Sequence, residues 1–130
     1  MKKFYERNKN TILPVILFVF IFALFSQMLF NGFVYDDLFS IVSSQIIKTV
    51  VNPIYYFFQA GVAQTQSPLA PDIYRPLGVW LLSLQYHLFG LSPFYFHLVS
   101  LLLHAANTIL FFVFLKRIFS APSHQAGRQG

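Results

Sequence analysis

Two adjacent aspartates, Asp36 and Asp37, are the residues of this chain best suited to acid–base chemistry. A carboxylate that faces a substrate hydroxyl can accept its proton, as a general base does. Successive residues of a helix point about 100° apart, so we expect only one of the two to face a common site. Helix capping is the alternative, because an aspartate ahead of a helix accepts hydrogen bonds from unpaired backbone N–H groups.

The segment Tyr74-Arg75-Pro76-Leu77 carries one of the few basic residues that lie far from the ends of the chain. A guanidinium group can bind phosphate through two parallel hydrogen bonds, so Arg75 is a candidate phosphate clamp. The other interpretation is an anchor whose charged end reaches lipid headgroups while its stem lies along apolar surface. The sequence leaves both interpretations open.

A third polar feature is a stripe of residues spaced three and four apart along an apolar run. Its members are His97, Ser100, His104, Asn107 and Thr108. Polar residues inside a membrane helix usually face other helices or a water-filled cavity. His97 and His104 lie about 10 Å apart along a helix axis, too far to share one zinc ion. The stripe therefore predicts packing against further helices, with a substrate cavity as the alternative, and no residue is assigned to a metal.

Two apolar runs must hold these residues in a membrane. Of the 130 residues, 56% are hydrophobic and only 10% are charged, whereas soluble domains carry about 25% charged residues. Residues 11–30 and 94–115 are each long enough to cross a bilayer. Thr11 and Pro14 resemble the start of the first helix, and Ser92-Pro93 the start of the second. The chain has no cysteine, which excludes a disulfide framework.

The basic residues flank the two runs, which indicates membrane topology rather than nucleic-acid binding. A cleaved signal peptide is disfavoured because the first run is long and is followed by no small-residue cleavage site. The expected organisation is all-α: two transmembrane helices joined by an extracytoplasmic loop, with both termini cytoplasmic. Its segments are a basic flank (1–10), a span (11–30), the loop (31–93), a second span (94–115) and a disordered tail (116–130).

The expected loop is unusually apolar. Leu77 to Phe89 is too short to cross a bilayer, so we expect an interfacial helix ended by Gly90, with Trp80 near the lipid headgroups. Asn52-Pro53 is expected to divide residues 38–60 into two short helices. Only Ala63 to Asp72 has the composition of a solvated loop.

The order of these features resembles the amino-terminal part of a polytopic GT-C glycosyltransferase. A span is followed by the acidic pair, then YRPL, then LFGLSPFYFHLVSLLLHAAN. The likeness covers about residues 31–119 and is greatest to protein O-mannosyltransferases and their transmembrane relatives with TPR repeats. Such enzymes transfer a sugar from a polyprenyl-phosphate carrier, so the resemblance implies a lipid-linked sugar as donor. It leaves metal dependence open.

The resemblance also implies roles for individual residues. Asp36 matches the family's base or acceptor-positioning group, with Asp37 as second candidate. Tyr74 and Arg75 would contact the carrier phosphate or hold the carboxylates, and His97 and His104 would lie at the substrate site without assigned roles. Family members have many more spans, so we expect a fragment that is inactive alone and needs further transmembrane helices or a partner subunit. A bacterial plasma membrane is favoured over the endoplasmic reticulum.

Two other functions fit parts of the pattern. A small non-enzymatic two-span protein could dock partner helices through its polar stripe, but it would need neither the acidic pair nor YRPL. A transporter would place charges or helix breaks at the middle of the bilayer. Here the charged residues lie at the edges of the runs.

Overall fold

The computed structural model describes the backbone of residues 2–49, 51–59 and 74–120, and the side chains of residues 11–49, 51–59 and 74–119. All regular secondary-structure elements in these ranges are helices, which confirms the all-α prediction. Contacts divide the chain into two compact units. We call Gln27–Val99 the loop unit, and Met1–Ser26 together with Ser100–Gly130 the span unit. The predicted solvated loop, Ala63 to Asp72, and residues 121–130 of the predicted tail lie outside the described residues.

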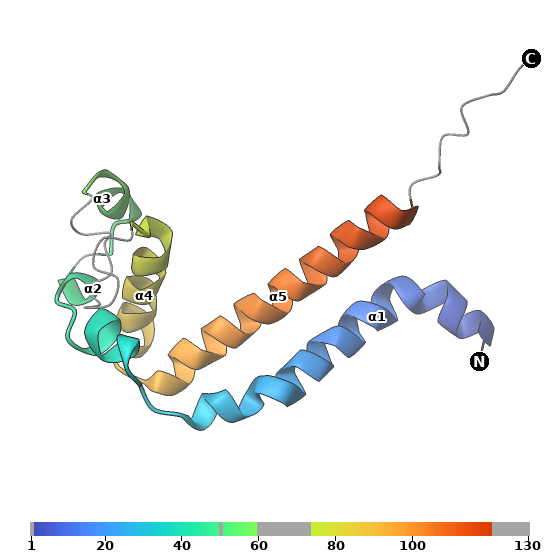
Figure 1. The fold of residues 1–130 in the computed structure, drawn as a ribbon, viewed down its shortest axis with the longest axis horizontal. Coiled ribbons are helices and arrows are strands. Elements are labelled where there is room, and N and C mark those ends of the chain that lie inside the picture. Colours follow the sequence, from blue (N-terminus) through green and yellow to red (C-terminus); the bar gives the residue numbers. More distant parts are fainter. Residues whose placement is uncertain (1, 50, 60–73, 121–130) are drawn as a thin grey trace, which may run out of the picture. The chain divides into compact units, whose positions relative to one another are not determined.

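The first helix, α1, runs from Lys2 to Phe25 and is followed by a 3₁₀ helix from Ser26 to Phe30 (Figure 1). Thr11 is therefore not a cap, contrary to our expectation, because helical backbone already precedes it. Pro14 lies inside the helix rather than in its first turn. It lacks an N–H and so removes one backbone hydrogen bond from the helix. The predicted apolar run, Thr11–Phe30, is nevertheless one of two stretches long and apolar enough to cross a membrane.

The last helix, α5, runs from Pro93 to Ser120 and begins at the predicted Ser92-Pro93 start. Proline at the first position lacks only an N–H that would have had no partner in the helix. The helix continues past Leu115, so residues 116–120 belong to it and not to a disordered tail. Its stretch Pro93–Phe119 is the second candidate span. The turns up to Val99 belong to the loop unit, and those from Ser100 onward belong to the span unit.

Short helices of the loop unit begin and end where the sequence provides breakers and caps. A π-helix (Leu38–Val42) and α2 (Ile46–Thr49) precede α3, which runs from Pro53 to Phe58. Asn52 caps α3, since its side-chain oxygen accepts a hydrogen bond from the Ile54 N–H at 3.0 Å. Helix α3 thus begins at the predicted break, but three short helices lie between residues 38 and 58 and not the two that we expected.

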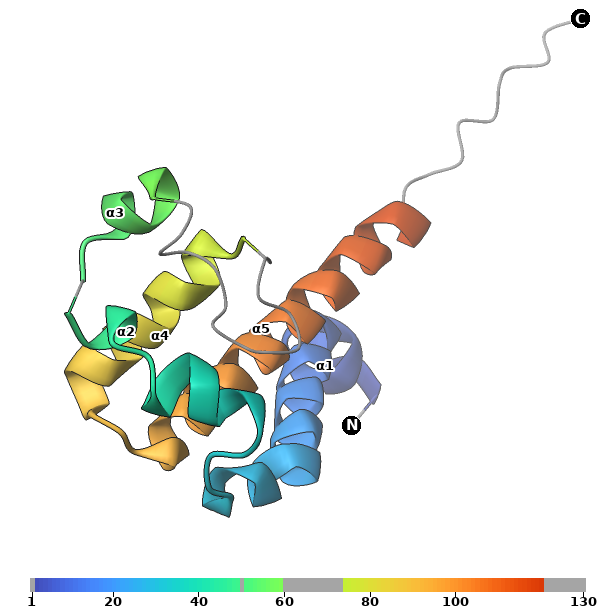
Figure 2. The same cartoon turned by 60° about the vertical axis from the view of Figure 1, so that its left-hand side comes forward.

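Helix α4 runs from Pro76 to Phe89 and is the element against which α2 and α3 pack. It ends at Gly90, as predicted, whose φ of 64° lies in the left-handed region that glycine adopts easily. Figures 1 and 2 both show α2 and α3 beside α4. The loop is therefore a packed helical unit and not only a series of separate helices on a membrane surface.

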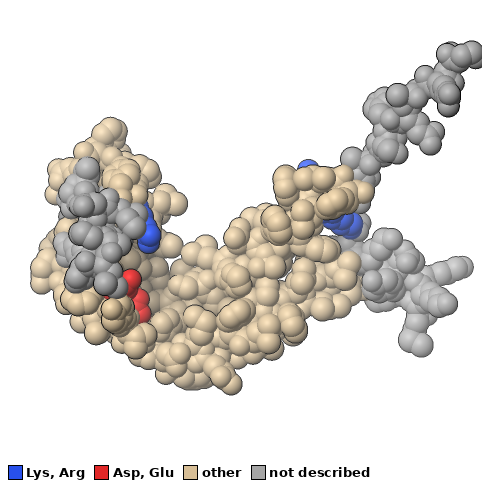
Figure 3. Space-filling model, in the orientation of Figure 1, with Lys and Arg blue, Asp and Glu red and all other residues tan. Residues whose placement is uncertain are grey.

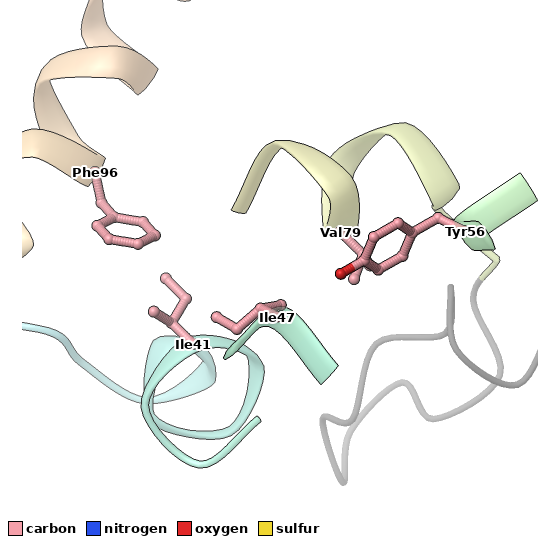
Figure 4. Packing of buried hydrophobic residues seen from close by; sticks show 5 residues of the cluster. All are labelled: Ile41, Ile47, Tyr56, Val79 and Phe96. Carbon is pink, nitrogen blue, oxygen red and sulfur yellow. The ribbon is translucent and has the colours of Figure 1, made fainter. Parts of the chain in front are cut away.

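A small core holds the loop unit together. It consists of Ile41, Ile47, Tyr56, Val79 and Phe96. In Figure 4 the Val79 side chain lies against the Tyr56 ring, while Ile41 and Ile47 extend towards Phe96. The Phe96 ring also meets Phe33 edge-on, with ring centroids 5.4 Å apart. The five core residues come from five elements: the π-helix, α2, α3, α4 and the start of α5. Phe33 adds a contact from the segment before the π-helix.

The span unit buries far fewer side chains. Ile21 on α1 and Leu101 and Ala105 on α5 are buried, and the Phe25 ring meets the His104 ring edge-on at 5.4 Å. Most other large apolar residues of both helices are exposed. Apolar side chains that no protein covers are the expected surface of a helix in lipid, where the surroundings are as apolar as leucine.

Candidate functional site

The acidic pair lies in a tight turn of the loop unit, between the 3₁₀ helix and the π-helix. Tyr35 precedes it with φ of 48°, a left-handed conformation that is unusual for a residue other than glycine. The Leu38 N–H donates to the Tyr35 carbonyl at 3.1 Å, and the Asp37 N–H donates to the Val34 carbonyl at 3.0 Å. Strained backbone of this kind is often found at functional sites. Nothing in the sequence identified Tyr35 as a candidate residue.

The two carboxylates differ in their surroundings. Asp37 is half-buried, and its Oδ2 accepts a hydrogen bond from the Val34 N–H at 3.3 Å. Its side chain makes no capping bond to the helix that follows, so the capping interpretation is wrong for Asp37. Asp36 is the more exposed member of the pair. Asp37 thus closes the turn, and Asp36 is the member whose side chain a substrate could more easily reach.

Tyr74 and Arg75 precede α4, and their side chains differ in their contacts. The Tyr74 hydroxyl donates a hydrogen bond to the Phe57 carbonyl at 2.7 Å, which ties this segment to the end of α3. Arg75 is exposed and makes no capping hydrogen bond at the start of α4. Figure 3 shows acidic and basic atoms on the same face of the loop unit. The described acidic residues of this unit are Asp36 and Asp37, and its described basic residues are Lys48 and Arg75.

Buried polar atoms mark a second part of the loop unit. The Nε2 atom of His97 and the Oε1 atom of Gln85 are buried and find no hydrogen-bond partner among the residues that the structure describes. Gln85 does donate from Nε2 to the Leu81 carbonyl at 3.1 Å. Unpaired buried polar atoms are rare and call for an explanation such as a ligand, a water or a reacting group. We predicted His97 as a site residue but not Gln85, whose only signal was an amide in an otherwise apolar run.

Aromatic hydroxyl and N–H groups fasten the loop unit from within. The Tyr56 hydroxyl donates to the Ile46 carbonyl at 3.3 Å and also bonds with Ser83, a fully buried residue. Burial raises the pKa of the Tyr56 phenol above its ordinary value of 10.0, while the Ser83 hydrogen bond acts in the opposite direction. The Trp80 Nε1–H donates to the Val51 carbonyl at 2.9 Å. These bonds hold the frame around the candidate residues, and the sequence did not reveal them.

His104 belongs to the span unit and not to the loop unit that contains the other predicted residues. Together with Leu103, Ala106, Asn107 and Leu110 it lines an open hollow of about 480 Å³ on α5. The Thr108 hydroxyl donates a hydrogen bond to the His104 carbonyl at 2.9 Å, so this hydroxyl has a partner within its own helix. Ser100, His104 and Asn107 are the exposed polar members of the stripe in this unit.

Within the described ranges, no three histidine, aspartate or glutamate side chains gather closely enough to hold a metal ion. Three kinds of reactive group stand out in this part of the chain. These are carboxylates in a tight turn, a guanidinium at the start of a helix, and an imidazole with an unpaired buried nitrogen.

Among known proteins, the chain is similar to protein O-mannosyl-transferases of human and mouse. It is 38% identical over 96 residues to protein O-mannosyl-transferase TMTC2 of Homo sapiens, which covers 72% of this chain. It is 32% identical over 92 residues to protein O-mannosyl-transferase TMTC1 of the same species, which covers 66% of this chain. The mouse TMTC2 protein matches at 37% identity over 98 residues. No protein-family model matches the chain, and no solved structure matches it.

These similarities support a relationship to protein O-mannosyl-transferases over much of the chain. The chain spans only 10% of the length of the human TMTC1 protein and 11% of human TMTC2. Together, the two apolar helices and the relatives indicate a membrane protein. The relatives are mammalian, so they give no support to a bacterial over an endoplasmic reticulum membrane.

Proposed function

We propose that this chain forms part of a membrane glycosyltransferase of the GT-C type, which transfers a sugar from a polyprenyl-phosphate donor to an acceptor hydroxyl. The observation that carries the proposal is the similarity to protein O-mannosyl-transferases at 32–38% identity over more than 90 residues. The loop unit adds support, because it contains the acidic pair, Tyr74, Arg75 and His97 within one packed unit.

In the proposed reaction, the oxygen of the acceptor hydroxyl attacks the anomeric carbon of the sugar. Asp36 accepts the proton that this hydroxyl loses. The bond between that carbon and the phosphate oxygen breaks, and the polyprenyl phosphate leaves with the bonding electrons. Arg75 would bind the phosphate as negative charge accumulates on it. Asp37 would position Asp36, since its own carboxylate is engaged with the Val34 N–H.

The proposal includes a topology and partners. Both termini face the cytoplasm and the loop unit faces outward or into a lumen, as the flanking basic residues predict. Donor-site walls and further membrane helices come from other parts of a longer chain or from a partner subunit. The 130-residue chain alone is accordingly expected to transfer no sugar.

The test measures transfer from a polyprenyl-phosphate mannose donor to a peptide bearing serine and threonine, using the natural product purified from its own membranes. Asp36→Asn should lower the rate by at least about a hundredfold while insertion into membranes is unchanged, because the amide cannot accept the proton. Transfer at a near wild-type rate would show that Asp36 is not the base.

Asp37→Asn is the matched control. Its amide oxygen can still accept the Val34 hydrogen bond, so the turn is kept and transfer should fall much less. If instead Asp37→Asn abolishes transfer and Asp36→Asn does not, the two roles are exchanged.

A second substitution tests the phosphate clamp. Arg75→Lys should raise the KM for the lipid-linked donor, because lysine keeps the charge but loses the two parallel hydrogen bonds. Lys48→Arg is the control, since the Lys48 ammonium bonds to the Val42 carbonyl within the loop unit. An unchanged KM in Arg75→Lys would favour the headgroup-anchor interpretation.

One observation favours a second candidate function, the non-enzymatic docking of other membrane helices. Asn107 lies near the middle of the candidate span Pro93–Phe119, and it is exposed beside His104 on the hollow of α5. An amide at mid-membrane depth gains from hydrogen-bonding a side chain of another helix. Native membranes that contain only a 15.0 kDa product, with no transfer activity, would favour this function.

A further inference from the structure

One surface of the loop unit carries a cluster of exposed apolar side chains around α3 and the start of α4. We call it the aromatic patch. Its members are Ile54, Phe57, Phe58, Tyr74 and Leu77. Phe58 is 84% exposed, Leu77 63% and Ile54 61%. Large apolar side chains grouped this way on a surface usually mark a place where a protein meets a partner or a membrane.

The aromatic patch is held in place and is not a loose end. The buried Tyr56 ring fixes α3 in the core, while the Asn52 cap fixes its start. The Tyr74 hydroxyl bonds to the Phe57 carbonyl and so joins the two halves of the patch at 2.7 Å. In Figures 1 and 2, α3 lies beside the first turns of α4, as the contacts between the two helices require. The structure thus holds these side chains outward.

The charged residues around the aromatic patch indicate what covers it. From Val51 to Gln59 and from Tyr74 to Leu77, Arg75 is the only charged residue. Aromatic side chains with one arginine at their edge are typical of the zone where lipid headgroups meet acyl chains, because the rings enter the apolar layer and the guanidinium meets phosphate. Tyr55, a neighbour of the patch on α3, adds an exposed aromatic ring that carries a hydroxyl.

We propose that the aromatic patch inserts into the outer interfacial layer of the same bilayer that the two long helices cross, with Phe58 deepest and Arg75 at headgroup depth, where it can still meet the phosphate of a lipid-linked donor. The inference rests on the membrane assignment within the proposed function but needs no transferase activity. Both ends of the loop unit continue directly into the candidate spans, Thr11–Phe30 and Pro93–Phe119. A bilayer is therefore the apolar phase that is always beside this unit.

The test uses the complete chain in phosphatidylcholine vesicles that contain a fraction of anionic lipid. The chain has no cysteine, so Phe58→Cys carries a single fluorescent label, and the high exposure of Phe58 makes misfolding an unimportant risk. Gln45→Cys is the matched control, an exposed position of the same unit outside the patch. Leu77→Cys repeats the measurement from the α4 side of the patch.

Lipids with a nitroxide near the headgroup should quench labels at positions 58 and 77 at least about threefold more than the label at position 45, and iodide in the water should show the reverse order. Equal iodide quenching at all three positions would overturn the inference. Labels at 58 and 77 that neither quencher reaches would also overturn it, because they would be covered by protein, either a second copy or another helix. Loss of transfer in a separate assay would not change these readings.

Discussion

The loop unit and the span unit contain similar proportions of apolar residues, but the loop unit buries more of them. The loop unit gathers core side chains from five helices, α4 among them, and Tyr56, Tyr74 and Trp80 donate hydrogen bonds to its backbone carbonyls. The span unit buries Ile21, Leu101 and Ala105 and leaves most of its large apolar residues exposed.

The proposed topology accounts for this difference, because it gives one unit lipid as its surroundings and the other unit water. In lipid, apolar burial between helices gives little driving force, so exposed leucine and phenylalanine cost nothing. At the membrane surface water competes for backbone groups, and irregular segments such as Val51 need hydrogen-bond partners from side chains. The loop unit should therefore respond to core and hydrogen-bond changes, and the span unit should not.

The largest effect is expected from Tyr56→Ala. The side chain is fully buried at the centre of the loop-unit core, so its removal leaves a cavity and unpaired partners. We expect a loss of about 3–5 kcal/mol of stability, measured by circular dichroism during thermal unfolding in detergent. Phe58→Ala is the control and should have little effect. A Tyr56→Ala chain as stable as wild type would show that the loop unit has no cooperative core.

Alkaline pH should weaken the same core by a smaller amount. The Tyr56 pKa is raised in the folded chain, so its contribution is fully present below the ordinary value of 10.0. Above that pH the unfolded chain loses the proton first, and stability falls until the pH passes the folded pKa. Unfolding midpoints measured from pH 8 upward should show a steeper decline in wild type than in Tyr56→Phe. Parallel declines would contradict this origin.

Tyr35→Gly should stabilise the loop unit, whereas Tyr56→Ala destabilises it. Glycine adopts a φ of 48° without the steric cost that tyrosine bears, so the turn before the acidic pair should gain about 1 kcal/mol. Val34→Gly is the control, because Val34 has no positive φ, and it should destabilise slightly. A lower unfolding temperature for Tyr35→Gly would mean that the Tyr35 side chain makes up for the strain. If transfer also falls, the strained turn serves the site.

The smallest effect is expected in the span unit. Leu110 is 68% exposed, and Leu110→Ala should change the pairing of α1 and α5 by less than about 0.5 kcal/mol in a bilayer. Leu101→Ala removes a buried contact and should weaken pairing more. Energy transfer between dyes on the two helices measures both. Equal effects would show that the exposed face of α5 is as important for packing as the buried one.

The sequence predicted those features that depend on local chemistry. The apolar runs, the start at Ser92-Pro93, the end at Gly90 and the break at Asn52-Pro53 follow from residue type and spacing. It did not predict that α2, α3 and α4 pack together, because apolar residues suit a core and a lipid surface equally. The start of α1 was misplaced since polar residues that precede a span can still be helical.

The candidate site was predicted only as a set of residue types. Asp36, Asp37, Tyr74, Arg75 and His97 all fall within the loop unit, while His104 falls in the other unit. The left-handed Tyr35, the carbonyl bonds of Tyr74 and Trp80 and the unpaired oxygen of Gln85 depend on contacts between distant segments. No local pattern encodes such contacts.

Trp80 is the only tryptophan in the chain, and its indole is bonded to a carbonyl 29 residues earlier. The tryptophan fluorescence of this protein therefore comes from a single indole, which lies where α4 meets the segment before α3. Opening of the junction between α4 and the segment before α3 should shift that emission to longer wavelength as water replaces the carbonyl. The chain thus has a built-in optical reporter of whether this junction is closed, readable without any label.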